Sequence, residues 1–280
     1  MLTALLALPA TLVGILTSAG HRHHQFVSLR DELVSIQGGG LYGHESVSAA
    51  AQGVGLDVVT LIVGIPLLLV ATYLARTGSL RAQLLQSGAL FYFAYTYLIF
   101  AFGAAYNPFF LVYVALFSAS SFALVLSVLS IDVGQLQGAT GSRLARRRVG
   151  GLLIGIGVIV LLLWLGRILP SISSNSAPPG LESYTTLVVQ AVDLSLIVPL
   201  LIVAGVLLLR RHPVGYLLSP ILLLWATTFG LALIGIQIAA AAAGIQLVTP
   251  VLFFAVLVAV VGGAATIHLF INISSVSSNR

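Results

Sequence analysis

Apolar side chains run through most of the chain in unbroken segments. A membrane β-barrel needs alternating apolar and polar positions, whereas these segments are continuous, so the pattern favours helices. A helix needs about 20 apolar residues to cross the hydrocarbon core of a bilayer. The pattern therefore predicts an all-α integral membrane protein with eight transmembrane helices. The predicted spans are 2–19, 57–75, 83–104, 108–131, 149–169, 187–209, 214–241 and 248–272.

The composition supports this class and excludes several others. Hydrophobic residues make up 59% of the chain and charged residues 7%, whereas about 25% of residues are charged in soluble domains. All 12 basic residues are Arg, so no Lys is present to form the Schiff base of a rhodopsin-like pigment. The absence of Cys excludes thiol redox chemistry, Fe–S ligation and disulfides.

The Arg residues divide unevenly between the two sides of the predicted bundle. Nine of the 12 follow the second, fourth, sixth and last spans, whereas Arg22, Arg30 and Arg167 lie on the other side. The positive-inside rule predicts that the Arg-rich side, with both termini, is cytoplasmic. The long loops 20–56 and 170–186 then face outward. Because the basic residues set topology, no nucleic-acid partner is expected.

The two halves of the chain resemble each other. PLLLVATYLAR (66–76) corresponds to PLLIVAGVLLLR (199–210), and NPFFLVYVAL (107–116) corresponds to TPVLFFAVLV (249–258). These matches predict a tandem repeat of four plus four spans. An even number of spans in each unit makes the repeats parallel, and the interface between such repeats often carries a substrate path.

This repeat divides the chain into three parts. The predicted parts are a first four-helix membrane repeat at 1–132 that includes the outer loop 20–56, a cytoplasmic Arg-rich linker at 133–148, and a second four-helix repeat at 149–280.

Two aspartates stand out at the predicted spans. Asp57 opens the second span and is predicted to cap that helix, with Thr60 three residues further on. Asp193 lies deeper, because a helix that starts at Ser183 places it about 15 Å along the axis. An ionisable group at that depth faces the bundle or a wet cavity rather than lipid. Gln190 shares its helix face.

The third predicted span adds an aromatic surface. Tyr92, Tyr95, Phe102 and Tyr106 recur at helical spacing, which is typical of packing and of an interfacial aromatic belt. The turn that carries Tyr106 and Asn107 lies on the same side of the membrane as the two aspartates.

Two interpretations of these polar groups remain open. In the first, Asp193 is a buried group bonded to Gln190, Ser195 or a Tyr, and the groups only hold helices together. In the second, they line a wet, outward-facing vestibule that binds a substrate. The candidate substrate-binding residues are Asp57, Thr60, Tyr106, Asn107, Gln190 and Asp193.

The outer loop contains the sequence HRHHQFVSLRDELVSIQ. Zn or Cu accepts His ligands, but the spacing of the histidines in this loop defines no tetrahedral set. No cofactor is expected, and Zn or Cu at this cluster is the weaker alternative. The candidate metal ligands are His21, His23, His24 and His44.

Helical spacing also predicts an amphipathic helix in this loop, lying against the membrane surface or the bundle. Its apolar face comprises Phe26, Leu29, Leu33 and Ile36. His268, in the last span, is predicted to be a hydrogen-bonded core group.

The stretches GLYGHESVSAAAQGVGLDVVTLIVGIPLLLVATYLARTGSLR and AFGAAYNPFFLVYVALFSASSFAL resemble a family of eight-span inner-membrane proteins found widely in bacteria. The resemblance covers mainly residues 40–132. It implies a bacterial inner-membrane location and draws attention to Asp57, Thr60 and Asn107. It implies no activity, because the family has no known one.

Three classes of function are consistent with the sequence. The first is a transporter or channel-like protein for a small solute or lipid. The second is a non-transporting accessory or sensory subunit, whose partners would be other membrane subunits or further copies of the chain in the bilayer. A metal-dependent membrane enzyme is third, since no P-loop, GxSxG or HExxH motif occurs. The lack of ionisable residues through the cytoplasmic half of the spans favours the second class over a proton relay.

Overall fold

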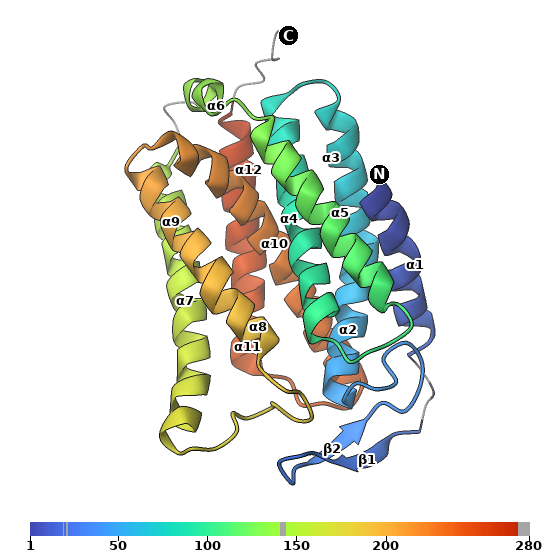
Figure 1. The fold of residues 1–280 in the computed structure, drawn as a ribbon. Coiled ribbons are helices and arrows are strands. Elements are labelled where there is room, and N and C mark those ends of the chain that lie inside the picture. The colour runs from blue at the N-terminus through green and yellow to red at the C-terminus, as the bar shows by residue number, and fades with distance from the viewer. Residues whose placement is uncertain (19, 21, 141–143, 274–280) are drawn as a thin grey trace.

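The computed structural model describes residues 1–18, 20, 22–140 and 144–273, which form a helical bundle with a small β-hairpin at one end (Figure 1). We call the two ends of the bundle the hairpin end and the α6 end. The elements are α1 (Leu2–Leu16), β1 (His24–Val27), β2 (Leu33–Ile36), α2 (Val47–Val59), α3 (Ile65–Ala75), α4 (Leu80–Gly103), α5 (Phe110–Leu129), α6 (Val133–Ala139), α7 (Arg146–Ser173), α8 (Val188–Val192), α9 (Val198–Leu209), α10 (Pro213–Ala242), α11 (Thr249–Leu257) and α12 (Gly263–Ile271). Three π-helical turns join consecutive helices, namely η1 (Thr60–Gly64), η2 (Asp193–Ile197) and η3 (Val258–Gly262).

The described part of the chain has 7 helices that are long and apolar enough to cross a membrane. They are α2–η1–α3, α4, α5, α7, α8–η2–α9, α10 and α11–η3–α12. The prediction of eight spans is corrected at the first segment, where α1 has 15 residues. At 1.5 Å per residue α1 is about 22 Å long, which is shorter than the hydrocarbon core of about 30 Å.

The helices run in the same order of directions in both halves (Figure 1). α1 and α7 run toward the hairpin end, and the spans α2–α3 and α8–α9 return. α4 and α10 then run toward the hairpin end, and α5 and α11–α12 return. This order agrees with a parallel repeat, while superposition of 1–132 on 149–272 stays a prediction.

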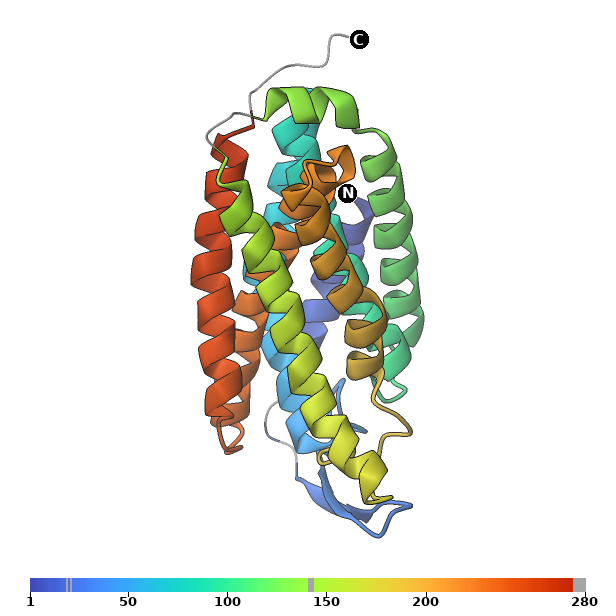
Figure 2. The same ribbon diagram turned by 90° about the vertical axis from the view of Figure 1, so that its left-hand side faces the viewer.

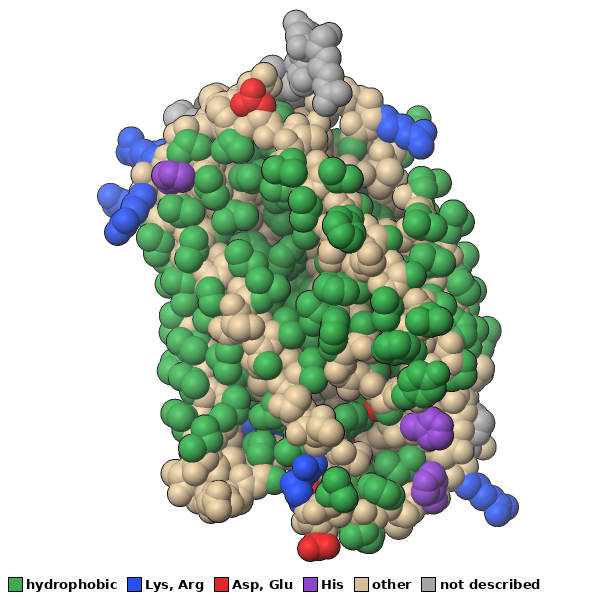
Figure 3. Space-filling model, in the orientation of Figure 1, with side chains coloured by type: hydrophobic (Ala, Val, Ile, Leu, Met, Phe, Trp, Pro, Cys, Tyr) green, Lys and Arg blue, Asp and Glu red, His purple; other side chains and the backbone are tan. Residues whose placement is uncertain are grey.

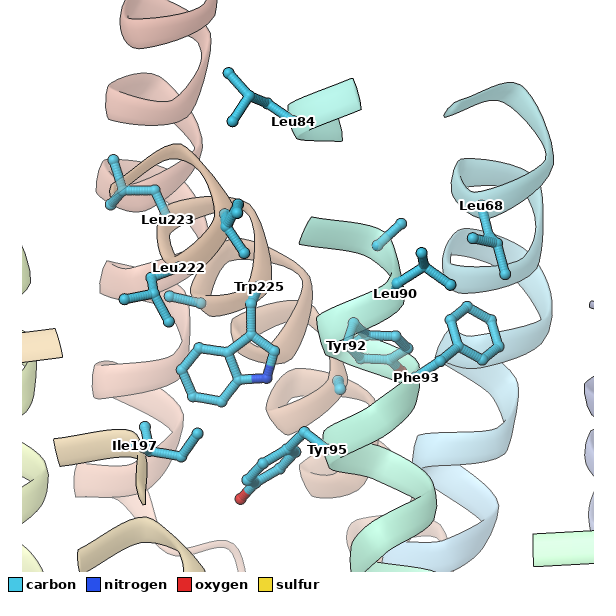
Figure 4. Packing of buried hydrophobic residues seen from close by; sticks show 14 of the residues in the cluster. Leu68, Leu84, Leu90, Tyr92, Phe93, Tyr95, Ile197, Leu222, Leu223 and Trp225 are labelled. Carbon is cyan, nitrogen blue, oxygen red and sulfur yellow. The ribbon is translucent and has the colours of Figure 1, made fainter. Parts of the chain in front are cut away.

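The core lies where α4 of the first half meets α10 of the second. The ring of Trp225 packs edge-on against Phe91 and Tyr95, with centroids 5.7 and 5.3 Å apart, and stacks on Phe229 (Figure 4). α5, α7 and α11–α12 bury much less of their surface. Figure 3 shows hydrophobic side chains across the middle of one face and charged side chains toward its two ends, as expected for a bundle that lies in a bilayer.

The two halves approach most closely where α2 crosses α10. A Cβ added to Gly55 would lie 2.5 Å from the carbonyl oxygen of Gly235, and one added to Gly235 would lie 2.6 Å from Val59. Small residues permit such backbone contact between membrane helices. The glycines therefore set the distance between the halves.

The outer loop forms a β-hairpin, so the predicted amphipathic helix is wrong. Phe26 pairs with Val34 in an antiparallel register, and Asp31 has a φ of 59° in the turn. Burial alternates along Leu33–Ile36 as exposed, buried, exposed, buried. The apolar residues that fit a helical period also fit the two-residue period of a strand, and the turn at Asp31 fixes the second arrangement.

Tyr92 and Tyr95 of the aromatic stripe are buried in α4, in agreement with packing, whereas Phe102 near the end of α4 and Tyr106 in the following turn are exposed. The prediction for His268 is corrected, because this residue is exposed rather than in the core. Its Nε2 atom accepts a hydrogen bond of 3.3 Å from the N–H of Ala145, so it joins the end of α12 to the start of α7.

We predict that Gly55→Ala lowers the stability of the bundle by about 1–3 kcal/mol, the usual cost of overpacking. The added methyl group would overlap the backbone of α10, which cannot move as a side chain could. The thermal unfolding midpoint in detergent measures the change. Gly151→Ala in α7 is the matched control, because nothing lies within 4 Å of its added Cβ. Equal midpoints for the two variants would contradict the close contact.

Candidate functional site

The sequence predicts that Asp57 caps a helix. In the structure it is instead a buried residue inside a span. α2 begins at Val47, and the Oγ of Ser46 caps it by accepting a hydrogen bond of 3.1 Å from the N–H of Ala49. Asp57 is only 3% exposed. The hydroxyl of Tyr42 donates a hydrogen bond of 2.6 Å to its Oδ2.

Two glycines shape the slot that holds the Tyr42–Asp57 pair. A Cβ added to Gly14 of α1 would lie 1.9 Å from Asp57 Oδ2, and one added to Gly53 of α2 would lie 2.9 Å from the ring of Tyr42. Helix α1 therefore covers the carboxylate directly. No side chain larger than a hydrogen atom fits between α1 and this oxygen.

Asp193 lies inside the bundle and bonds to a tyrosine, as one sequence interpretation predicted. The Tyr95 hydroxyl donates a hydrogen bond of 2.8 Å to Oδ1, and the indole Nε1–H of Trp164 donates one of 2.8 Å to Oδ2. Ser195 instead bonds the carbonyl oxygen of Ala191. The carboxylate thus connects α4 and α7 to the span that contains η2.

The start of this span differs from the prediction. The helix begins at Val188 rather than near Ser183, so Asp193 lies only about one and a half turns from the helix start. It is nevertheless buried, with only 6% of its surface exposed, because α4, α7 and α10 surround it.

The π turns occupy equivalent positions in the two halves. Thr60 and Asp193 each begin a π turn, and each comes six residues before a proline, Pro66 or Pro199. A proline has no N–H and its ring clashes with the carbonyl group four residues earlier, so the helix widens locally. In both turns the bond that closes the turn spans five residues, as from the N–H of Val198 to the carbonyl oxygen of Asp193.

A pair of buried polar side chains three residues apart lies at each of η1 and η2, with one member in the turn and the other in the helix before it. Asp57 and Thr60 form the pair in the first half, and Gln190 and Asp193 form it in the second. The hydroxyl groups of Thr60 and Tyr92 are hydrogen-bonded at 2.8 Å. The sequence marks all four residues as candidates, and their binding role stays a prediction. It gives no indication of the widened turns.

A cavity of about 40 Å³ adjoins Asp193. Its walls come from α7, η2–α9, α10 and α11–η3, and they include Trp225 and Phe229. Among the described residues, the buried Nε1–H of Trp225 has no hydrogen-bond partner. Figure 2 shows α7 crossing the bundle diagonally, so that it diverges from α11 toward the hairpin end.

Tyr106 and Asn107 occupy the turn between α4 and α5. Tyr106 is 77% exposed, whereas Asn107 is buried. The Oδ1 of Asn107 accepts a hydrogen bond of 2.9 Å from the N–H of Phe109, and its Nδ2 donates to the carbonyl oxygen of Ala105. These bonds lie within the turn itself, so Asn107 has a clear structural role there.

Glu45 joins three loops at the hairpin end. Its Oε1 accepts a hydrogen bond of 2.7 Å from the N–H of Ala105, and its Oε2 accepts one from the hydroxyl of Tyr184. Arg30 of the hairpin donates bonds of 2.6 Å to the carbonyl oxygens of Glu182 and Tyr184. We call these contacts the loop clasp, because they connect the outer loops of the two halves.

The electrostatics of the loop clasp depend on burial. Burial raises the pKa of Glu45 above its ordinary value, although the hydrogen bonds from Tyr184 and Ala105 act in the opposite direction. Burial also raises the pKa of Tyr184, which keeps its hydroxyl protonated as a donor.

The histidine cluster gains no support from the geometry. His23, His24 and His44 are exposed, and His21 lies outside the described residues. Within the described ranges no group of three or more His, Cys, Asp or Glu side chains is placed to hold a metal ion. A Zn or Cu site at this loop therefore stays an untested prediction.

The fold and the buried polar pairs define the chain as a multi-pass integral membrane protein embedded in a lipid bilayer. Comparison with protein-family models, curated proteins and solved structures finds no match for the chain. The class rests on the structure, and the resemblance at 40–132 adds no established family.

We predict that Tyr42→Phe destabilises the protein by about 1–3 kcal/mol, because it leaves the buried Asp57 carboxyl group without its donor. The midpoint of unfolding in mixed detergent–SDS micelles measures the loss. Tyr73→Phe, at an exposed position of α3, is the control and should leave the midpoint unchanged. A Tyr42→Phe protein as stable as this control would show that the bond contributes nothing.

A second prediction concerns pH and the loop clasp. Because the folded pKa of Glu45 is raised, the folded state holds more protons than the unfolded state between about pH 4.3, the ordinary value, and the raised value. The free energy of unfolding should therefore fall as pH rises through this window. Glu45→Gln should remove that part of the pH dependence in thermal unfolding scans. An unchanged slope in the variant would contradict it.

Proposed function

We propose that the protein moves a small solute or lipid across the membrane, along a path between the two four-helix halves, 1–132 and 149–280. The observation that carries this proposal is the buried polar pair at a π turn, which occurs once in each half. Buried ionisable groups inside membrane bundles mark substrate or ion pathways, and π turns are frequent at functional sites.

The π turns supply binding groups besides side chains. Because Pro66 and Pro199 lack an N–H, the carbonyl groups of Ile62 and Ser195 lose their ordinary helical donors. Polar side chains and freed carbonyl groups near the interface of two repeats resemble the broken helices that bind substrates in transporters. In this proposal Asp57, Thr60, Gln190 and Asp193 bind substrate on the path.

The arrangement corresponds to a closed state at the hairpin end. The loop clasp joins the outer loops of the two halves, and α2 contacts α10 through Gly55 and Gly235. Passage between the halves requires the clasp to open. Tyr106 and Asn107 lie in one of the clasped turns, so they would form the outer mouth of the path.

We further propose that the protein lies in a bacterial inner membrane with both termini in the cytoplasm. Helix α1 begins and α12 ends toward the α6 end (Figure 1). That end also carries Arg81, whose guanidinium bonds the carbonyl oxygens of Ile271 and Ile273. By the positive-inside rule, the end richer in Arg faces the cytoplasm.

A non-transporting accessory or sensory subunit is the second candidate. The observation in its favour is that both aspartates bond neutral donors that join helices, as structural groups do. In that case the exposed hairpin and outer turns would bind another membrane subunit. A metal-dependent enzyme at the histidine loop is third and has no geometric support.

Reconstitution of the purified protein in liposomes tests the first candidate. Entry of small solutes is followed by light scattering, and movement of headgroup-labelled lipid by dithionite bleaching. Wild-type protein should exceed empty liposomes in one assay, and Asp193→Asn should slow that movement by about tenfold, the effect of losing roughly 1.4 kcal/mol.

The control variant is Asp132→Asn. Asp132 is exposed and caps α6 by accepting a hydrogen bond from the N–H of Gln135, a role that Asn fills equally well. This variant should match the wild type. Movement no faster than in empty liposomes in both assays would overturn the transport proposal and favour the accessory subunit.

A further inference from the structure

We propose that Asp193 Oδ1 and the Tyr95 hydroxyl form a reversible proton-binding site that exchanges its proton with water in the adjoining cavity. A role for this proton as the coupling ion of transport rests on the function proposed above. Binding of the proton itself can be measured without transport.

The two partners of the carboxyl group differ in what they can do. The indole Nε1–H of Trp164 is only a donor, so Oδ2 must accept its hydrogen bond in every state. A tyrosine hydroxyl both donates and accepts. The proton is therefore placed on Oδ1, which faces Tyr95 at 2.8 Å.

The exchange involves one hydroxyl rotation. With the proton bound, Oδ1–H donates to the oxygen of Tyr95, whose own hydrogen turns away. On release, the O–H bond at Oδ1 breaks, a cavity water accepts the proton and passes it onward, and the Tyr95 hydroxyl turns back to donate to the carboxylate. Trp164 is a positioning residue that keeps the carboxyl group oriented in both states.

The surroundings favour a proton as the ion bound at this carboxyl group. Among the described residues Asp193 has no ion-pair partner, and the elements packed against it contribute Tyr95 from α4, Trp164 from α7, and Trp225 and Phe229 from α10. A carboxylate among neutral groups in an apolar bundle gains most from a proton, because a proton removes the charge without needing further ligands.

Arg167 lies beside Trp164, one of the partners of Asp193. Its guanidinium carbon lies 6.0 Å from the ring centroid of Trp164, and the guanidinium group donates its hydrogen bonds to the carbonyl oxygen of Pro179. These bonds direct the guanidinium group to the loop and not to Asp193.

The cavity beside Asp193 is the proposed place of exchange. Its volume of about 40 Å³ has room for roughly three waters, since a water needs about 10–15 Å³ of this space. Asp193 and the unpartnered Nε1–H of Trp225 supply polar partners for water in this part of the bundle. Figure 4 shows the side chains of Trp225, Tyr95 and Ile197 near one another, and they come from α10, α4 and η2.

Asp57 has no such space for water on the side that faces α1. Its Oδ2 is bonded to Tyr42 and lies against the backbone of Gly14, where a single added carbon atom would overlap it. The structure therefore assigns exchange to Asp193 and leaves Asp57 as the matched comparison.

The experiment uses tryptophan emission from the full-length protein in lipid nanodiscs. The chain contains 2 Trp residues. Trp164 bonds Asp193 and Trp225 lines the same cavity, so both report on this site. Titration between about pH 4 and pH 9, which brackets the range open to a carboxyl group in a protein, should show one transition in the wild type. Asp193→Asn should abolish the transition, and Asp57→Asn should keep it.

Tyr95→Phe supplies a second test that does not depend on folding of the Asp193 variant. It removes the hydroxyl donor that stabilises the released form, so the midpoint of the transition should move to higher pH by about one unit. Circular dichroism confirms that each variant is folded. A wild-type emission that is constant with pH, an unchanged transition in folded Asp193→Asn, or an unchanged midpoint in Tyr95→Phe would overturn the proposal.

The two proposals fail separately. A pH transition that depends on Asp193, without movement of solute or lipid in liposomes, would keep the proton site and remove transport. Transport that depends on Asp193, without a transition in emission, would keep transport and remove the proton site.

Discussion

A carboxyl group inside a membrane bundle needs hydrogen-bond donors from its neighbours, because no lipid can supply them. Much of this structure follows from that requirement. Asp193 draws its donors from Tyr95 of α4 and Trp164 of α7, so three spans from both halves are joined at one point. Asp57 draws its donor from Tyr42, which brings the outer loop down onto α2 beneath the cover of α1. The contacts that supply donors to the two acids thus also hold the helices in position.

The prolines contribute a second constraint that acts through the backbone. Pro66 and Pro199 cannot continue the regular hydrogen-bond ladder, and each span widens into a π turn just before its proline. The turn changes the direction of the side chains that precede it, and in both spans these are the buried polar pair. A helix break that costs stability is therefore located where polar groups need room inside the bundle, which is the pattern expected of a functional site.

The sequence predicts the spans well because long apolar runs leave no other option in a bilayer, but it places some helix starts poorly. Residues 47–56 consist mostly of small side chains, so the sequence predicts a helix start at Asp57 with the acid as its cap, whereas α2 starts at Val47. The sequence does not distinguish the hairpin from a helix, because Phe26 and Leu33 fit both helical and strand periods.

The partners of the candidate site were harder to predict than its members. Asp57, Thr60, Gln190 and Asp193 stand out in sequence because polar residues are rare in apolar runs. Their donors do not stand out, since an aromatic residue in a span is usually a packing group. Trp164 and Tyr95 meet Asp193 across 29 and 98 positions of the chain, respectively. Such pairings depend on how the helices pack, which a single sequence does not specify.

Residues at the same distance from the two prolines differ in chemistry between the two halves of the chain. Position by position from the prolines, Thr60 corresponds to Asp193 and Tyr92 corresponds to Trp225. In the first half the hydroxyl groups of Thr60 and Tyr92 are hydrogen-bonded to each other. Asp57 packs against Gly14 of α1. In the second half a cavity adjoins Asp193. Asp57 is thus packed tightly against α1, whereas Asp193, although also buried, has space beside it within the bundle.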